Sequence, residues 1–292
     1  MRFENILIVG GGLIGSSIAR AARAKKQCST IYIADTSEAA CKTITKLGIA
    51  DGVADGAADH FAAKADLVIL CTPSARLSMT AMAIMPSMKA DAVLTDVGSV
   101  KGHFVEALMG RVREDIHFIP GHPIAGTENS GPESGFPELF EDRWCVLTPP
   151  DNTDAQAVSD LTEFWEGLGS DVVVMDSSRH DIVMATTSHL PHLIAYTLVG
   201  TAIDMETVTR KEVVKFSAGG FRDFTRIAAS DPVMWRDVFL TNKAATLEVV
   251  DRFIEDLTAL KRAIRWDDGD TLLDSFAKTR DIRRRILDAD SD

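Results

Sequence analysis

Three glycines near the N-terminus restrict the fold of this chain more than any other feature of its sequence. Gly10, Gly12 and Gly15 occupy the turn between an apolar, β-branched run at 5–9 and an alanine-rich helical pattern at 13–25. In such a turn the first glycine allows tight bending, the second lets the backbone approach a pyrophosphate, and the third lets helix and strand pack closely. The phosphates then lie at the positive end of the helix. The pattern predicts a dinucleotide-binding site.

An acidic residue closes the next predicted strand. Asp35 ends the apolar run 30–35, at about the ~20-residue spacing expected for a ribose-binding carboxylate. A carboxylate there binds ribose hydroxyls and repels a 2′-phosphate, and no arginine follows it at once, since the next residues are Thr36 and Ser37. We therefore predict NAD in preference to NADP, although the sequence does not decide how strict that preference is.

Strand-like apolar runs alternate with helical patterns through the first 176 residues, and the remainder is helical throughout. Alternation of this kind is typical of a mostly parallel sheet with helices on both faces. We predict an α/β fold in which a Rossmann-type, doubly wound, mostly parallel sheet forms a dinucleotide-binding domain, residues 1–176, followed by an all-helical domain, residues 177–292. The predicted strands are 5–9, 30–35, 66–73, 92–98, 117–121, 143–149 and 171–176.

Polar residues follow several of these strands at their carboxyl ends, where doubly wound sheets bind ligands. Thr72 and Pro73 close the third main strand. Ser99 follows the fourth, and it either caps a helix beginning near Val100 or hydrogen-bonds a substrate or nicotinamide. The predicted cofactor-binding residues are Gly10, Gly12, Leu13, Ile14, Gly15, Asp35, Thr72 and Pro73.

One histidine lies in a glycine-rich stretch on the same rim of the sheet. GHPIAGTENSG, residues 121–131, follows a predicted strand and contains too much glycine to form a helix. His122 is thereby placed where the nicotinamide should end, with Pro123 stiffening the turn. A neutral imidazole accepts a proton readily near neutral pH, so His122 is a candidate general base.

The helical half begins with a predicted long helix at 177–203, which contains two more histidines. His189 and His192 lie on one face, and Pro191 between them should bend or interrupt the helix. Two histidines without a cysteine or carboxylate at ligand spacing make an incomplete metal site, so no metal is predicted. They are interpreted either as buried structural groups or as polar groups lining a cleft.

A block rich in arginine follows at 217–242, containing Arg226 and, nearby, Trp235. Arginine is suited to bidentate capture of carboxylates. Surface ion pairs with Trp235 in the core explain the same pattern equally well. The last fifty residues combine charge with helical apolar spacing, which is typical of helices that pack on the domain or on a partner subunit.

The bulk properties exclude several classes of partner. A formal net charge of −12 argues against nucleic acid or an anionic membrane, because both require a basic surface. The four cysteines have no metal-ligand spacing, which favours reduced thiols in a cytoplasmic protein. The N-terminus is not a signal peptide, and no apolar run approaches the length of a membrane span.

Taken together, these segments resemble the prephenate/arogenate (cyclohexadienyl) dehydrogenase family of tyrosine biosynthesis. The resemblance spans nearly the whole chain, and the motifs occur in the family's order. They are GGGLIG with Asp35, DVGSVK (96–101), GHPIAGTENSG (121–131), TSHLPH (187–192) and GGFRDFTRIAASDPVMW (219–235).

The resemblance implies a role for each matching residue. His122 takes the proton from the substrate's ring hydroxyl, Ser99 hydrogen-bonds that hydroxyl or orients His122, and Arg226 grips a substrate carboxylate. His180 and Asp181 fall in a matching segment and are weaker candidates. The other substrate-binding residues implied are His189, His192, Trp235 and Thr127.

The implied activity is the NAD-dependent oxidative decarboxylation of prephenate to 4-hydroxyphenylpyruvate, of arogenate to tyrosine, or of both. The implied assembly is a homodimer formed through the helical domain. The sequence does not decide between the two substrates. Family members often carry a further regulatory domain, for which this chain has no room. We therefore do not expect feedback through such a domain, and inhibition by tyrosine at the active site stays open.

Two other functions remain to be discriminated. A dehydrogenase of the β-hydroxyacid or 6-phosphogluconate type would use a lysine on the helical domain, for which Lys211 and Lys215 are available. Such an enzyme should be inactivated by Lys211→Met and Lys215→Met and should tolerate His122→Asn. A dinucleotide-sensing protein without turnover would bind NADH but produce none from a cyclohexadienol.

Overall fold

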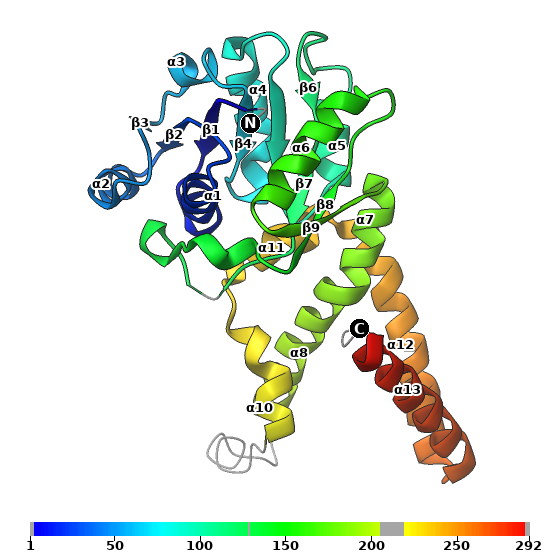
Figure 1. The fold of residues 1–292 in the computed structure, drawn as a ribbon. Helices are drawn as coiled ribbons and strands as arrows, with labels where there is room; N and C mark the ends of the chain where they lie inside the picture. The colour runs from blue at the N-terminus through cyan, green and yellow to red at the C-terminus, as the bar shows by residue number, and fades with distance from the viewer. Residues whose placement is uncertain (1–2, 128, 205–218, 290–292) are drawn as a thin grey trace. The chain divides into compact units, whose positions relative to one another are not determined.

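The computed structural model describes residues 3–127, 129–204 and 219–289. Its largest sheet has six parallel strands in the order β3-β2-β1-β4-β5-β6 (Figure 1). This order places the first and fourth strands side by side at the centre, as in a doubly wound dinucleotide-binding fold. The strands are β1 (Asn5–Val9), β2 (Thr30–Asp35), β3 (Gly52–Asp55), β4 (Leu67–Leu70), β5 (Val93–Asp96) and β6 (His117–Phe118).

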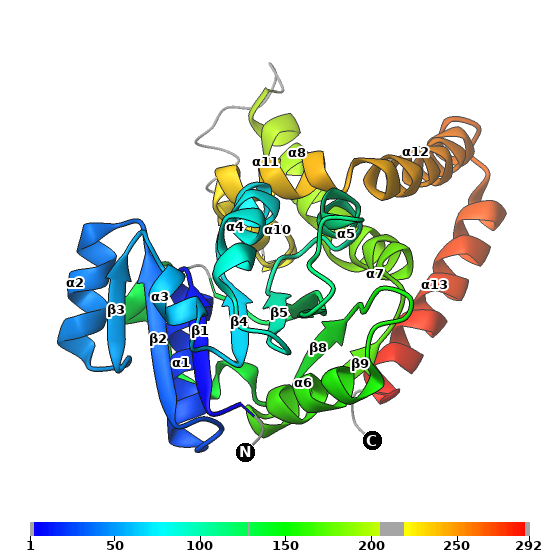
Figure 2. The same cartoon turned by 90° about the horizontal axis from the view of Figure 1, so that it is seen from above.

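The pleat of the central strands divides the core between two faces. In β1, Ile6 and Ile8 join one buried cluster with α1, α2 and α6, whereas Leu7 joins a second cluster with α3, α4 and α5. Figure 2 shows α1 and α6 on one side of the sheet and α4 and α5 on the other. The predicted Rossmann-type α/β class is confirmed. These helices are α1 (Leu13–Ala24), α2 (Glu38–Leu47), α3 (Asp59–Ala62), α4 (Leu77–Ile84), α5 (Gly102–Leu108) and α6 (Ala155–Gly167).

A second, three-stranded sheet holds the glycine-rich stretch. Its order is β7-β8-β9, with β7 (Gly121–Pro123) antiparallel to β8 (Arg143–Leu147) and β8 parallel to β9 (Ser170–Val174). The predicted strand at 117–121 is confirmed only at its start, as β6; its extension to residue 121 was wrong, because the chain leaves the main sheet after β6 and pairs with β8 instead. His122 consequently lies within a strand, opposite Val146, and not in a turn. The sequence also gave no sign of the edge strand β3, which is short and only weakly apolar.

The helical half begins with one long helical run. It comprises α7 (Ser177–Met184), the π-helical turn η5 (Ala185–His189) and α8 (Leu190–Asp204). The π turn ends just before Pro191, whose ring cannot fit a regular α-helical ladder, so the predicted interruption is confirmed. By length and composition this run could cross a membrane, contrary to our expectation. A single helix of this kind is weak evidence for a membrane span; 22% of its apolar window is buried, and the run buries His180, Asp181 and His189.

Two short helices complete the first of two compact units, Met1–Lys243. They are α10 (Gly219–Thr225) and α11 (Pro232–Thr241), joined by the turn η6 (Arg226–Ala229). Asp231 accepts a hydrogen bond from the Met234 amide (2.7 Å) and caps α11, whose first residue is proline. Lys211 and Lys215, named for the alternative dehydrogenase, lie outside the described residues.

The second unit, Ala244–Asp292, consists of most of α12 (Lys243–Arg265) together with α13 (Gly269–Ala289). Both helices expose large apolar side chains, among them Leu257 and Ile264 on α12 and Phe276 on α13, and Trp266 between the helices is exposed as well. The predicted helical character of this part is confirmed. The predicted domain boundary between residues 176 and 177 stays a prediction.

The close packing at the nucleotide turn generates a stability prediction. A Cβ added at Gly15 would lie 2.0 Å from the Gly10 carbonyl oxygen, whereas one added at Gly12 would meet nothing within 4 Å. Alanine in a helix interior gains ~0.5–1 kcal/mol over glycine, but overpacking against fixed backbone costs ~1–3 kcal/mol. We expect Gly15→Ala to lower the free energy of unfolding in urea, with Gly12→Ala as the matched control close to wild type. Equal stability of the two variants would contradict this packing argument.

Candidate active site

The nucleotide turn leaves open space where a pyrophosphate would lie. Gly10 has φ +106° and passes so close to β4 that an added Cβ would lie 2.5 Å from the Cys71 carbonyl oxygen. Gly12 precedes α1 without any side-chain cap, so the first amides of that helix are available to an anion. Only glycine fits at Gly10, and the space above Gly12 fits the phosphates of a dinucleotide.

The Asp35 carboxylate is already oriented at the carboxyl end of β2. Its Oδ2 accepts a hydrogen bond from the Gly11 amide (2.8 Å) and its Oδ1 accepts one from the Ser37 amide (2.8 Å). Across the turn, the Thr72 hydroxyl is buried without a hydrogen-bond partner among the described residues. These groups fit a bound NAD: the Asp35 carboxylate suits a ribose, and the unpaired Thr72 hydroxyl lies beside the open glycine backbone.

His122 lies buried on β7 and contacts a second histidine from the helical run. Its Nδ1 is 2.8 Å from Nε2 of His180, which is fully buried on α7. His180 Nδ1 in turn lies 2.8 Å from Oδ1 of Asp181. The structure thus joins three residues that are separated by up to 59 positions in sequence.

The Asp181 carboxylate also receives the first amides of α5. Its Oδ1 accepts from the Lys101 amide (2.9 Å) and its Oδ2 from the Gly102 amide (2.8 Å). Burial raises the pKa of this carboxyl, but the hydrogen bonds from His180, Lys101 and Gly102 outweigh burial and hold the pKa below its usual value. Asp181 is therefore a carboxylate at neutral pH.

A buried ion pair fixes the backbone next to His122. Lys101 Nζ contacts the Asp96 carboxylate and donates to the Gly121 carbonyl oxygen (2.6 Å). Asp96 also accepts from the amides of Gly98 (2.8 Å) and Gly121 (3.2 Å). Burial raises the pKa of Asp96 and lowers that of Lys101, while the contact between the two opposes both shifts. These contacts pin β7 to the end of β5.

The surroundings keep the His122 ring neutral. Burial lowers its pKa well below the usual value, and electrostatic interactions with His180, with the Lys101 ammonium and with His189 lower it further. A neutral imidazole that accepts a proton only transiently is suited to general base catalysis at neutral pH.

Two further histidines line the helical side of this cluster. His189 Nδ1 is 3.1 Å from Asn242 Nδ2, which also donates to the Asp181 carbonyl oxygen (2.9 Å). His192 Nδ1 donates to the Ser188 carbonyl oxygen (2.9 Å), and its ring stacks on Trp235 with centroids 3.6 Å apart. Among the described residues, no group of His, Cys, Asp or Glu is arranged to hold a metal.

Arg226 lies at the start of η6, with its side chain exposed. Burial lowers the pKa of His192, the hydrogen bond to Ser188 opposes that shift, and the positive charge of Arg226 lowers the pKa further. Among the described residues no carboxylate forms an ion pair with Arg226. The other explanation of the arginine-rich block, surface ion pairs, holds for Arg236, which pairs with Asp237 (2.7 Å).

The two remaining predicted residues, Ser99 and Thr127, form no hydrogen bond or ion pair with the cluster among the described residues. Ser99 is half-buried in the loop before α5, and α5 begins only at Gly102 without a side-chain cap, so the capping alternative for Ser99 was wrong. Thr127 is exposed and accepts a hydrogen bond from the Asn129 amide (3.2 Å). The roles of both in substrate binding stay predictions.

Sequence reasoning did not single out several members of the cluster. Lys101 and Asp96 stood within a recognised motif, DVGSVK, but an ion pair between them is not visible from spacing. Asn242 carried no signal at all. His180 and Asp181 were weak candidates, and only tertiary contact with β7 and α5 shows what they bind.

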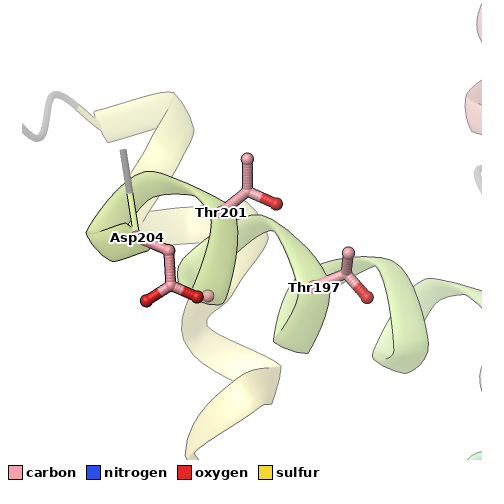
Figure 3. A pocket seen from close by; sticks show the side chains of 4 residues that line it. Thr197, Thr201 and Asp204 are labelled. Atoms are coloured by element: carbon pink, nitrogen blue, oxygen red, sulfur yellow. The ribbon is translucent and has the colours of Figure 1, made fainter. Parts of the chain in front are cut away.

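A separate hollow lies on the C-terminal half of α8, away from the histidines. It is lined by Thr197, Gly200, Thr201 and Asp204, and Figure 3 shows the three side chains on neighbouring turns of the helix. The described part of its lining offers two hydroxyls and one carboxylate and contains no cation or imidazole. We therefore assign the chemistry to the cluster around His122.

Comparison with known families agrees with this geometry. Residues 18–174 match the model of the prephenate dehydrogenase nucleotide-binding domain, and residues 176–278 match the prephenate dehydrogenase dimerization domain. The chain belongs to the prephenate dehydrogenase family. It is an NAD-dependent oxidoreductase, in keeping with the open nucleotide turn and the placed Asp35.

Individual relatives cover almost the whole chain. A cyclohexadienyl dehydrogenase of Zymomonas mobilis is 43% identical over 96% of this chain and 95% of that relative. The crystal structure of a prephenate dehydrogenase from A. aeolicus in complex with hydroxyphenyl propionate and NAD+ has a TM-score of 0.90 at 36% identity, covering 97% of this chain and 98% of that one. A Synechocystis arogenate dehydrogenase structure has a TM-score of 0.82 at 26% identity, covering 96% and 99%.

More distant structures share only the fold. A 3-hydroxyisobutyrate dehydrogenase from Salmonella typhimurium has a TM-score of 0.53 at 15% identity, covering 86% of this chain and 88% of that one. A likeness of that degree gives no support to the lysine-dependent alternative.

The buried histidines generate a prediction about pH and stability. Burial, together with His180 and His192, lowers the pKa of His189 to about 4, against an opposing effect of Asp181. Between about 4 and the usual value of 6.5 the unfolded chain binds this proton and the folded protein does not, so the free energy of unfolding falls as pH is lowered through that window. Across this window, His189 lowers the free energy of unfolding by about 3 kcal/mol.

The variant His189→Asn keeps a hydrogen-bond acceptor near Asn242 but cannot titrate. We expect its urea-unfolding free energy to fall less steeply than that of the wild type as pH drops from neutral toward about 4. Parallel pH profiles for the two proteins would refute the depressed pKa.

Proposed function

We propose that this protein catalyses the NAD-dependent oxidative decarboxylation of prephenate, of arogenate or of both, as a step of tyrosine biosynthesis. The observation that carries the proposal is a buried, neutral His122 at the carboxyl-end rim of a dinucleotide-binding sheet. The names of the relatives support both substrates, because one is a prephenate and another an arogenate dehydrogenase.

The chemistry requires a base and a site for anionic substrate. Bound NAD+ supplies the hydride acceptor for the carbinol carbon of the ring. His122 takes the hydroxyl proton, the ring carboxylate departs as CO2, and the ring becomes aromatic, which makes the step irreversible. Proton removal by a placed base typically contributes about 10²–10⁴-fold, and orientation of substrate against cofactor contributes much of the rest.

The remaining site residues are proposed from the family pattern and their surroundings. Arg226 has no ion-pair partner among the described residues, and its charge acts on His192, so it suits a substrate carboxylate. Ser99 is proposed to hydrogen-bond the reacting hydroxyl. His189, His192, Trp235 and Thr127 are proposed to line the substrate pocket. Gly10, Gly12, Leu13, Ile14, Gly15, Asp35, Thr72 and Pro73 are proposed to hold NAD.

The test is NADH formation by purified protein with NAD+ and with prephenate or arogenate in parallel. We expect turnover with one or both, and the ratio of kcat/KM values identifies the preferred substrate. His122→Asn should lower kcat by about 10²–10⁴-fold while NAD+ binding is kept, because only proton removal is lost.

The matched control is His60→Asn, a change at an exposed histidine on α3, which should leave kcat unchanged. A His122→Asn variant as active as the wild type would remove His122 from the mechanism. A wild-type protein that binds NAD+ but turns over neither substrate would remove the proposed reaction and favour a sensing role.

We also propose a cytoplasmic homodimer built through the helical domain, with the domain boundary near residue 176. The matched dimerization-domain model and the exposed apolar side chains of α12 and α13 support this assembly. Light scattering at assay concentration should give about twice the chain mass of 31.7 kDa. Replacing Ile264 and Phe276 with aspartate should shift the mass toward one chain, and a monomeric wild type would refute the dimer.

A further inference from the structure

The contacts around Asp181 fix the position of every proton between α5 and His122. A backbone amide can only donate a hydrogen bond, and the Asp181 carboxylate receives two of them, from Lys101 (2.9 Å) and Gly102 (2.8 Å). The carboxylate can only accept. His180 Nδ1, 2.8 Å from Asp181 Oδ1, must therefore carry a proton.

The same reasoning extends from His180 to His122. In a neutral imidazole one nitrogen donates and the other accepts, so His180 Nε2 is an acceptor when its Nδ1 is protonated. That acceptor faces His122 Nδ1 at 2.8 Å, which must then be the protonated nitrogen of His122. His122 Nε2 is left with a free lone pair. Two amides at the start of α5 thus determine which nitrogen of His122 can act as a base.

We propose that His180 and Asp181 are positioning residues that hold His122 in the Nδ1-protonated form, so that Nε2 is the atom that takes the substrate proton. This inference rests on the proposed role of His122 as base. His180 touches neither cofactor nor substrate by this scheme; it acts through His122, and Asp181 acts through His180. When Nε2 accepts a proton, the Nδ1 proton stays donated to His180 and the ring orientation is kept.

The variant Asp181→Asn tests the direction of the hydrogen bonds that run from Asp181 through His180 to His122. Asparagine has one oxygen for three N–H donors, and an amide NH2 turned toward His180 would reverse both hydrogen bonds and put the proton of His122 on Nε2. In serine proteases the corresponding loss of a histidine-orienting aspartate lowers kcat about 10⁴-fold. We expect about a 10²–10⁴-fold loss in kcat with little change in KM for NAD+.

The decisive readout is nitrogen-15 NMR of histidine-labelled protein at neutral pH, with His122 assigned by comparison with His122→Asn. The wild type should show His122 protonated at Nδ1 and unprotonated at Nε2, and Asp181→Asn should move the proton to Nε2. Asp51→Asn is the matched control, since Asp51 also accepts a backbone amide, that of Ile31 (2.8 Å), at the opposite end of the sheet. It should change neither spectrum nor kcat.

A second pair of variants leaves the α5 amides untouched. Glutamine at position 180 can place its oxygen near the former Nε2 and accept from His122 Nδ1, whereas leucine cannot. We expect His180→Gln to remain within about 10-fold of wild-type kcat and His180→Leu to fall about 10²-fold or more.

Equal kcat values for His180→Gln and His180→Leu would overturn the inference. So would a wild-type spectrum with His122 protonated at Nε2, and that spectrum decides the matter whether or not the variants fold. Failure of the proposed reaction would appear as absent turnover with an unchanged wild-type spectrum, so the two failures are distinguishable.

Discussion

The carboxylate of Asp181 is the interaction on which the rest of the site depends. A buried carboxylate is costly unless its oxygens are hydrogen-bonded, and this one accepts from two amides of α5 and from His180. Because Asp181 lies on α7 and the amides belong to α5, the same group attaches the helical run to the dinucleotide-binding sheet. Loss of the hydrogen bonds to Asp181 would leave its buried charge unpaired and would release His180 from its orientation.

The charges near His122 are arranged to keep its ring neutral yet able to accept a proton. The Lys101 ammonium is held beneath β7 by Asp96 and the Gly121 carbonyl, and its charge opposes protonation of His122. Asp181 contacts the far nitrogen of His180 and raises the pKa of His189. The exposed guanidinium of Arg226 stands apart from this buried set, where a charged group can meet an anionic substrate without first paying for burial.

Much of the fold could be predicted from the sequence because its signals are local. Glycine spacing, the Asp35 strand end, and the Asp231–Pro232 helix start each depend on neighbouring residues and backbone sterics, and the structure has them as expected. Errors arose where pairing is not local. The apolar pattern at 117–121 is the same whether the chain continues one strand or starts another, so the transfer of His122 to β7 was not visible. Edge strand β3 is too short and too weakly apolar to predict.

For the site, the sequence by itself determined which chemistry was available: a phosphate-binding turn, a ribose carboxylate, and one histidine confined between Gly121 and Pro123. Those features follow from residue type and short spacing. The tertiary structure alone decided how His122 is held, because its partner lies 58 positions away and the amides that orient Asp181 lie 80 and 79 positions from it. Hydrogen bonds over such separations depend on where sheet and helices pack, and no local pattern encodes the direction of their protons.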